Sequence, residues 1–225
     1  MGLLIDTLAE HLGDAVRTGC ELGPIQPERH QVSLQIHGDT HVHDQLIVTT
    51  PQATIRDRLP GMPIGWLDDV PAARLAAIHL AYEDAQVPGG LPGFGWLAHS
   101  RQRPDALGCL WVSGTFPAHA PAGTHLLRVM VGGARSPTLA ARSDRELVEH
   151  AQQLLKEVQG ITASPLLTHV QRASIPQYPV GFARRLRLLH QVHPRVHFGG
   201  WWWGQVGVAA STLFAAERVR AWRDR

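Results

Sequence analysis

The fold of this 225-residue chain is decided by residues 108–135, GCLWVSGTFPAHAPAGTHLLRVMVGGAR. Two parts of this stretch, residues 107–116 and 124–132, have the apolar content and turn-rich boundaries of β-strands. The segment between them is rich in Pro, Gly and Ala and predicts a connection. A third strand is expected just upstream, at residues 96–99, after a Pro- and Gly-rich segment. The centre of the chain is therefore expected to be a β-sheet.

The best helix of the chain follows this stretch, at residues 143–159. Ser143 is a good N-cap with Glu146 three residues on, and Gly160 ends the segment. Apolar residues from Leu147 to Val158 recur at helical spacing and predict one buried face. Further downstream the patterns predict strands at 166–172 and 195–198 and helices at 180–191 and 209–223.

Upstream of the decisive stretch the elements are less regular. Leucines between residues 3 and 12 form one helical stripe, which Gly13 ends. The continuously apolar run at residues 45–50 indicates a strand buried on both faces and stopped by Pro51. The remaining expectations are strands at 20–25, 31–36 and 40–50, a short helix from 70 to 80, and a strand at 78–82.

This order of elements predicts an α/β fold of mixed α+β type, with a parallel component. Residues 56–194 form a strand-rich insert, and the segments that bracket it, 1–55 and 195–225, are expected to belong to one layer. No internal repeat is present.

Composition excludes several classes of function. The 21 basic and 19 acidic residues give a formal charge of +2, with no long basic run to bind nucleic acid. Cys20 and Cys109 stand far apart, which argues against a disulfide framework and a zinc site. No apolar run reaches the roughly 18 residues of a spanning helix, and the start lacks a signal peptide. A cytoplasmic protein is expected, with peripheral membrane contact left open.

Residues 37–43, HGDTHVH, invite a metal interpretation because His41 and His43 share one strand face. No carboxylate or cysteine at ligand spacing completes a site, so we prefer an exposed hairpin and assign no metal. Ser113 and Ser211 lack the Gly-x-Ser-x-Gly turn that would hold a nucleophile. No catalytic residue is assigned.

Three segments carry a resemblance to a known family. Residues 108–135 have its strand, Phe-Pro, Ala-Pro-x-Gly turn and Gly-Gly-Ala-Arg ending; Ile175-Pro-Gln-Tyr178 with Gly181 matches a second motif. Residues 200–208, GWWWGQVGV, resemble its C-terminal flavin segment. Together they resemble the flavin-dependent protoporphyrinogen oxidases of the amine-oxidase-like flavoproteins.

The resemblance implies the C-terminal part of a two-domain FAD-dependent fold, without its N-terminal dinucleotide-binding βαβ unit. Residues 1–55 and 195–225 would be the remnant of the FAD-binding domain, and 56–194 the substrate-binding domain. The implied reaction is oxidation of a porphyrinogen to a porphyrin with oxygen as acceptor, in heme biosynthesis. A separate N-terminal FAD-binding half and a homo-oligomer are further partners that the resemblance allows.

FAD is the implied cofactor. The family's Asn after Gly200 is Trp201 here, and a Gly is replaced by Gln205, so this chain is expected to be inactive alone. Residues implied to contact the cofactor are Leu22, Thr50, Pro51, Gly200, Trp201, Val206, Gly207 and Val208. Residues implied to contact the substrate are Phe94, Trp96, Phe116, Arg128 and Arg135.

Two alternatives stay open. Another amine-oxidase or desaturase type of flavoenzyme would share the architecture, although Ile175-Pro-Gln-Tyr178 argues against it. A non-catalytic binding or interaction module is favoured by the altered flavin segment. The missing half that the resemblance implies leads us to expect exposed apolar surface on residues 1–51 and 195–225 and a tendency to associate.

Overall fold

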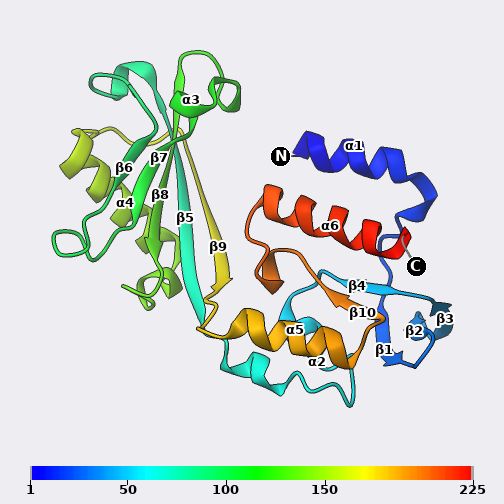
Figure 1. Cartoon of the computed structure of the whole chain (residues 1–225). Helices are drawn as coiled ribbons and strands as arrows, with labels where there is room; N and C mark the ends of the chain where they lie inside the picture. The colour runs from blue at the N-terminus through cyan, green and yellow to red at the C-terminus, as the bar shows by residue number, and fades with distance from the viewer. Residues whose placement is uncertain (1, 224–225) are drawn as a thin grey trace. The chain divides into compact units, whose positions relative to one another are not determined.

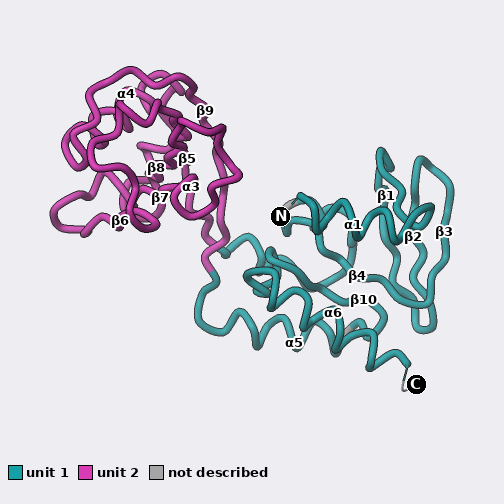
Figure 2. The backbone as a smooth tube through the Cα atoms, turned by 90° about the horizontal axis from the view of Figure 1, so that it is seen from above, with its two compact units in different colours: residues 1–70, 178–225 teal, residues 71–177 magenta. Residues whose placement is uncertain are grey.

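The computed structural model describes residues 2–223 and divides the chain into two compact units. Unit 1 comprises residues 1–70 and 178–225, and unit 2 comprises residues 71–177 (Figure 2). The chain crosses between the units twice, at 70–71 and at 177–178. Unit 2 is thus an insert within unit 1, as the element order predicted.

Unit 2 is built on a five-stranded antiparallel sheet with strand order β6-β7-β8-β5-β9. The long strands β5 and β8 form its centre, and the decisive stretch supplies β7, β8 and the turn between them. Its elements are β5 (Ala72–Glu83), β6 (Gly95–Leu97), β7 (Gly108–Trp111), α3 (Val112–Thr115), β8 (Thr124–Gly132), α4 (Asp144–Gln159) and β9 (Leu167–Pro176).

Helix α4 covers one face of this sheet (Figure 1). It begins with the predicted capping box between Ser143 and Glu146 and ends at Gly160, which adopts a left-handed conformation with φ of 70°. Its buried stripe packs against alternate residues of β5, including Ile78 and Leu80, which have no exposed surface. The predicted helix and its cap are confirmed.

The prediction of a helix at residues 70–80 is wrong, because this segment is the first part of strand β5. Its alanines favour a helix locally. However, Ala76, Ile78, Leu80 and Tyr82 are buried at every second position, and the strand pairs with a neighbour on each side. Sheet pairing outweighs intrinsic propensity here.

Unit 1 contains an antiparallel three-stranded sheet, a parallel strand pair and four α-helices. In Figure 1 helices α6 and α5 lie on opposite sides of the parallel pair β4–β10. The elements are α1 (Gly2–Leu12), β1 (Leu22–Pro27), β2 (Val32–Ile36), β3 (Asp39–His43), β4 (Leu46–Val48), α2 (Gln52–Arg56), α5 (Phe182–Val192), β10 (Val196–Phe198) and α6 (Val208–Arg223). Residues 2–223 also include six 3-10 turns across both units: η1 (Gly13–Ala15), η2 (Gly65–Asp69), η3 (Asp84–Gln86), η4 (Pro117–His119), η5 (Leu139–Ala141) and η6 (Trp201–Trp203).

The strand expected at residues 40–50 is two strands in different sheets. β3 pairs with β2, whereas β4 pairs in parallel with β10, from the far end of the chain. Ile47 is 37% exposed, so the prediction that this run is buried on both faces is wrong. The β4–β10 pairing joins the two flanks of the insert in one parallel strand pair.

The boundaries of the insert differ from 55/56 and 194/195. Ile55, Leu59 and Leu67 pack into the core of unit 1, and Leu186 and Leu189 of α5 join them there. Residues 56–70 and 178–194 therefore belong to unit 1 because their apolar side chains are buried in its core.

The expected apolar surface is present on helices α1 and α6. Neither helix has a fully buried residue, and leucines such as Leu8 (50%) and Leu213 (60%) are widely exposed. Among residues 2–223, no helix has both the length and the apolar character needed to cross a membrane.

Candidate functional site

The candidate cofactor site lies at the carboxyl edge of the parallel pair β4–β10. Because the two strands run in the same direction, the segments that follow Val48 and Phe198 emerge at the same edge. The amide of Gly199 donates to the carbonyl of Val48 over 3.0 Å and continues the pairing. The predicted residues Thr50, Pro51 and Gly200 are thereby brought together.

Three side chains hold the turn at residues 199–207 in place. Gln52 Nε2 donates to the carbonyl of Trp202 over 2.7 Å, and Trp203 Nε1 donates to the carbonyl of Thr50 over 3.1 Å. The hydroxyl of Tyr178 donates to the carbonyl of Trp201. Tyr178 ends the Ile-Pro-Gln-Tyr motif, so two of the sequence motifs meet at this turn.

The three tryptophans have different environments. Trp203 has no exposed surface and packs against Phe198 with ring centroids 4.4 Å apart. Trp201 and Trp202 are half-buried and contact each other at 4.9 Å. The bulky side chain of Trp203 is thus part of the core of unit 1 and points away from solvent.

The last residues of the same turn are exposed to solvent. Val206, Gly207 and Val208 are exposed, and Val208 begins α6, where the first amide groups of a helix have no partner within it. Gly200 has φ of 89° and ψ of −175°, a conformation restricted to glycine.

This edge fits the flavin ring that the resemblance implies. The side-chain oxygens of Thr50 (Oγ1) and Gln205 (Oε1) are buried and have no hydrogen-bond partner among the described residues. A buried polar atom without a partner is costly unless a ligand or water satisfies it. The acceptors suit a ring N–H, and the free amides at the start of α6 suit a ring carbonyl.

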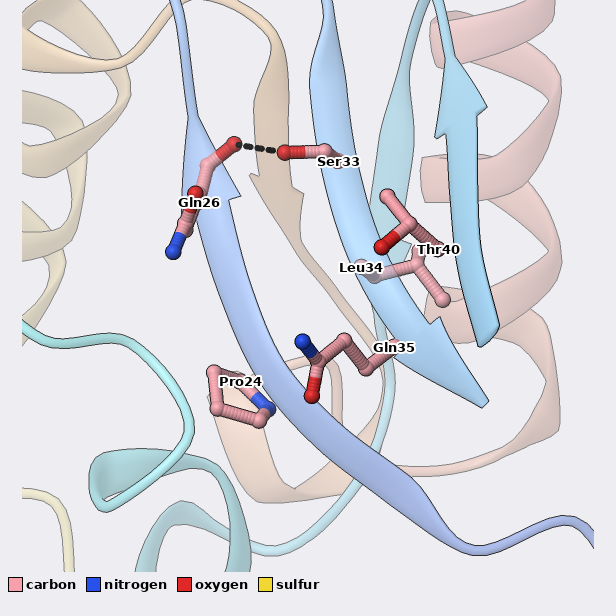
Figure 3. A pocket seen from close by; sticks show the side chains of 6 residues that line it. All are labelled: Pro24, Gln26, Ser33, Leu34, Gln35 and Thr40. Carbon is pink, nitrogen blue, oxygen red and sulfur yellow. Dashed lines mark hydrogen bonds between the residues drawn. The ribbon is translucent and has the colours of Figure 1, made fainter. Parts of the chain in front are cut away.

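Leu22 lies apart from this edge, in β1 of the three-stranded sheet, where it pairs with Ile36. The small pocket in this sheet is lined by Gln26, Ser33 and their neighbours, and the hydroxyl of Ser33 contacts the carbonyl of Gln26 at 3.5 Å (Figure 3). Its volume of about 70 Å³ holds only a few waters and cannot hold a ring system.

A second candidate surface is the face of the unit 2 sheet opposite to α4. One row of residues crosses four strands on this face: Leu110 pairs with Arg128, Arg128 with His79, and His79 with His169. We call these four residues the cross-strand row. The guanidinium Nε of Arg128 donates to His79 Nε2 over 2.7 Å. Burial, together with the nearby Arg128 charge, lowers the pKa of His79.

The other residues predicted to meet substrate do not lie in this row. Trp96 packs into the core beneath α4, and its indole donates to Gln159 of that helix. Phe94 and Phe116 are 73% and 51% exposed, outside the strands. Arg135 is exposed in the turn after β8, where it donates to the carbonyl of Ala98.

Two functional candidates were missed by the sequence analysis, His79 and Gln205. His79 had no motif to mark it, and only the strand register places it against Arg128. Gln205 stood out only as a departure from the family pattern. Its side-chain oxygen is buried without a hydrogen-bond partner among residues 2–223, which makes it a candidate acceptor for a ligand.

Burial raises the pKa of the Cys109 thiol to about 12, so it stays protonated and inert. No group of three or more His, Cys, Asp or Glu residues is placed to hold a metal ion between residues 2 and 223.

Comparison with known proteins shows the family to which the chain is similar. Residues 1–219 match the family model of flavin containing amine oxidoreductases. Coproporphyrinogen III oxidase of Bacillus subtilis is 28% identical over 179 residues, which cover 76% of this chain and 38% of that protein. Human protoporphyrinogen oxidase is 30% identical over 159 residues, covering 66% of this chain and 33% of that protein.

Solved structures show the same fold. A protein of Exiguobacterium sp. 255-15 assigned as a protoporphyrinogen oxidase superposes with a TM-score of 0.79 at 21% identity, covering 97% of this chain and 51% of that chain. Cyclohexylamine oxidase from Brevibacterium oxydans gives 0.70 at 16% identity, covering 97% and 52%. The chain therefore spans about half the length of these structures and less than half of its curated relatives.

Proposed function

The chain belongs to the flavin-containing amine oxidoreductase family, and from this premise we propose that it contributes to FAD-dependent oxidation of a porphyrinogen. In this proposal unit 1 carries the turn that holds the flavin ring, and unit 2 carries the sheet face that holds the macrocycle. The observation that carries the proposal is the solvent-exposed segment at residues 206–208, which lies at the start of α6 while the bulky side chain of Trp203 is buried in the core.

The residues at the cofactor edge have binding roles only. Thr50, Gln205 and the amides at the start of α6 would satisfy the polar rim of the ring, with Pro51, Gly200 and Trp201 shaping its surroundings. When bound, FAD supplies the acceptor for hydride equivalents, and oxygen reoxidises it. The protein's part is then to hold the substrate and shield it, which fits the absence of any assigned acid, base or nucleophile.

The porphyrinogen class is supported by the names of the relatives, which include coproporphyrinogen III oxidases and protoporphyrinogen oxidases from several organisms. A macrocycle with acidic side arms also fits unit 2, where apolar Leu110 and Met130 flank the cation of Arg128 on one face. Phe94 and Phe116 would contact it from the surrounding loops.

The test supplies the purified chain with FAD and air and adds either coproporphyrinogen III or protoporphyrinogen IX. Saturable binding of both FAD and porphyrin is the expected result. The appearance of fluorescent porphyrin above the rate of a protein-free blank would show in addition that the chain turns over alone. Binding of FAD without any binding or oxidation of porphyrin would favour another amine-oxidase-type substrate. Binding of neither would leave a non-catalytic module.

A further inference from the structure

The Arg128 side chain is held by one hydrogen bond and carries a charge that no neighbour neutralises. Its Nε donates to His79 at 2.7 Å, whereas no acid is recorded as its partner within residues 2–223. The residue is half-buried in the centre of the sheet. Arginine is seldom buried in proteins without a partner, so this position calls for an anion.

The bond to His79 also decides which part of the guanidinium is free. An arginine can grip a carboxylate either through Nε and one terminal nitrogen or through both terminal nitrogens. Because Nε is engaged by His79, the end-on fork of the two terminal nitrogens remains. No partner for these two nitrogens is recorded among the described residues.

His79 can accept the hydrogen bond from Arg128 Nε only when its imidazole is neutral. A protonated imidazole would lose its acceptor nitrogen and place a second cation next to Arg128. The half-buried position on β5, between Arg128 on β8 and His169 on β9, favours the neutral ring. The pair thus presents a single positive charge.

The neighbours of the fork define the ligand further. Leu110 stands beside Arg128 in the cross-strand row, and Leu126 and Met130 lie two residues away on the same strand face. All three are half-buried. A single planar cation set among apolar side chains suits a carboxylate carried on a large apolar body.

We propose that Arg128 binds one carboxylate side arm of the macrocycle through its two terminal guanidinium nitrogens. In this proposal His79 is the positioning residue that orients the guanidinium. This inference rests on the proposed function, and it assigns the contact with the carboxylate to Arg128 and not to Arg135. Arg135 is exposed, and its guanidinium already donates to the backbone carbonyl of Ala98. No partner side chain between residues 2 and 223 orients it toward the sheet face that carries Arg128.

The test titrates the full chain, with FAD present, with protoporphyrin IX and separately with its dimethyl ester. The two share one ring and differ in their carboxylates, and binding is followed by quenching of tryptophan fluorescence. The acid is expected to bind more tightly than the ester. Arg128→Gln should weaken binding of the acid roughly tenfold to hundredfold, the size expected when charge-assisted hydrogen bonds to a carboxylate are lost. Its affinity for the ester should stay unchanged.

Further variants separate positioning from folding. Arg128→Lys keeps the charge without the fork and should recover only part of the affinity for the acid. His79→Leu should weaken binding of the acid and leave binding of the ester unchanged. His79→Gln, which restores an acceptor, should recover the affinity for the acid. Arg145→Gln on α4, which covers the other face of the sheet, removes the same charge and should change neither ligand.

Three results would overturn the inference. The ester could bind as tightly as the acid, His79→Leu could bind the acid like the unaltered chain, or Arg135→Gln alone could remove the preference for the acid. In each case porphyrin binding itself would stand. If neither ligand binds to the unaltered chain, the porphyrinogen function fails together with this inference.

Discussion

Trp203 donates its indole N–H to the backbone carbonyl of Thr50 over 3.1 Å and thereby joins the segment after β10 to the segment after β4. The two residues are 153 positions apart in the sequence. The same indole packs against Phe198 and has no exposed surface. This one side chain therefore contributes both to the core of unit 1 and to the shape of the candidate cofactor edge.

Replacing Trp203 should destabilise the chain more than replacing its neighbours. Trp203→Ala is expected to lower the free energy of unfolding by about 3–5 kcal/mol, because it leaves a cavity in the core. Trp201→Ala, at a half-buried position, should cost less than half of that. Urea unfolding followed by circular dichroism measures both. Equal effects would show that Trp203 is not the anchoring residue.

Gly199 is expected to be intolerant of any side chain. A Cβ at this position would lie 2.0 Å from a ring carbon of Phe214 on α6, closer than atoms can approach. Gly199→Ala should therefore lower the free energy of unfolding by about 1–3 kcal/mol, through displacement of the ring. Combining it with Phe214→Leu should restore part of the loss. An additive double variant in thermal unfolding would contradict this steric account.

Stability should fall as the pH drops below about 6.5, the ordinary pKa of histidine. Burial lowers the pKa of His190, with a contribution from the Arg218 charge, and His190 Nε2 accepts the amide N–H of Phe198 over 3.1 Å. In acid the unfolded chain binds a proton at this position before the folded chain does, so unfolding is favoured.

The measurement for His190 is the free energy of unfolding between pH 5 and 8. His190→Gln is expected to flatten the dependence, since glutamine offers an acceptor that does not titrate in this range. His30→Gln, at an exposed position, serves as the control and should leave the dependence unchanged. A variant at His190 with the same pH dependence as the unaltered chain would contradict the assignment.

Self-association should depend on one side of helix α1. Leu4, Leu8 and Leu12 recur at intervals of four and are 44–55% exposed, which marks an apolar stripe. Leu8→Glu is expected to shift the chain toward the monomer in sedimentation velocity. Val42→Glu places the same charge at a similarly exposed apolar position on strand β3, outside the helix, and should have less effect. A chain that is monomeric throughout would refute this prediction.

The sequence predicted those elements whose signals are local. The capping box of Ser143 and the glycine at 160 fixed α4 to within a residue. The apolar content and turn-rich boundaries of residues 124–132 predicted the bounds of β8. It failed where pairing between distant segments decides, as in β5, whose alanines resemble a helix until its two neighbouring strands are known.

The candidate site shows the same division. The resemblance of residues 200–208 to a flavin segment drew attention to this turn, but it did not predict that Trp203 points inward. His79 could not be found without the register that sets it opposite Arg128. Side-chain direction in an irregular turn, and partners across a sheet, depend on tertiary packing that no local pattern encodes.

The most direct test of the central claim is a titration of FAD with the purified chain, followed by flavin fluorescence. The account predicts saturable quenching that riboflavin, which shares the ring, competes away. It also predicts that Val206→Glu at the open turn weakens binding at least tenfold, while Val219→Glu, near the other end of α6, does not. Absence of quenching, or equal binding by both variants, would contradict the claim that this turn holds the flavin.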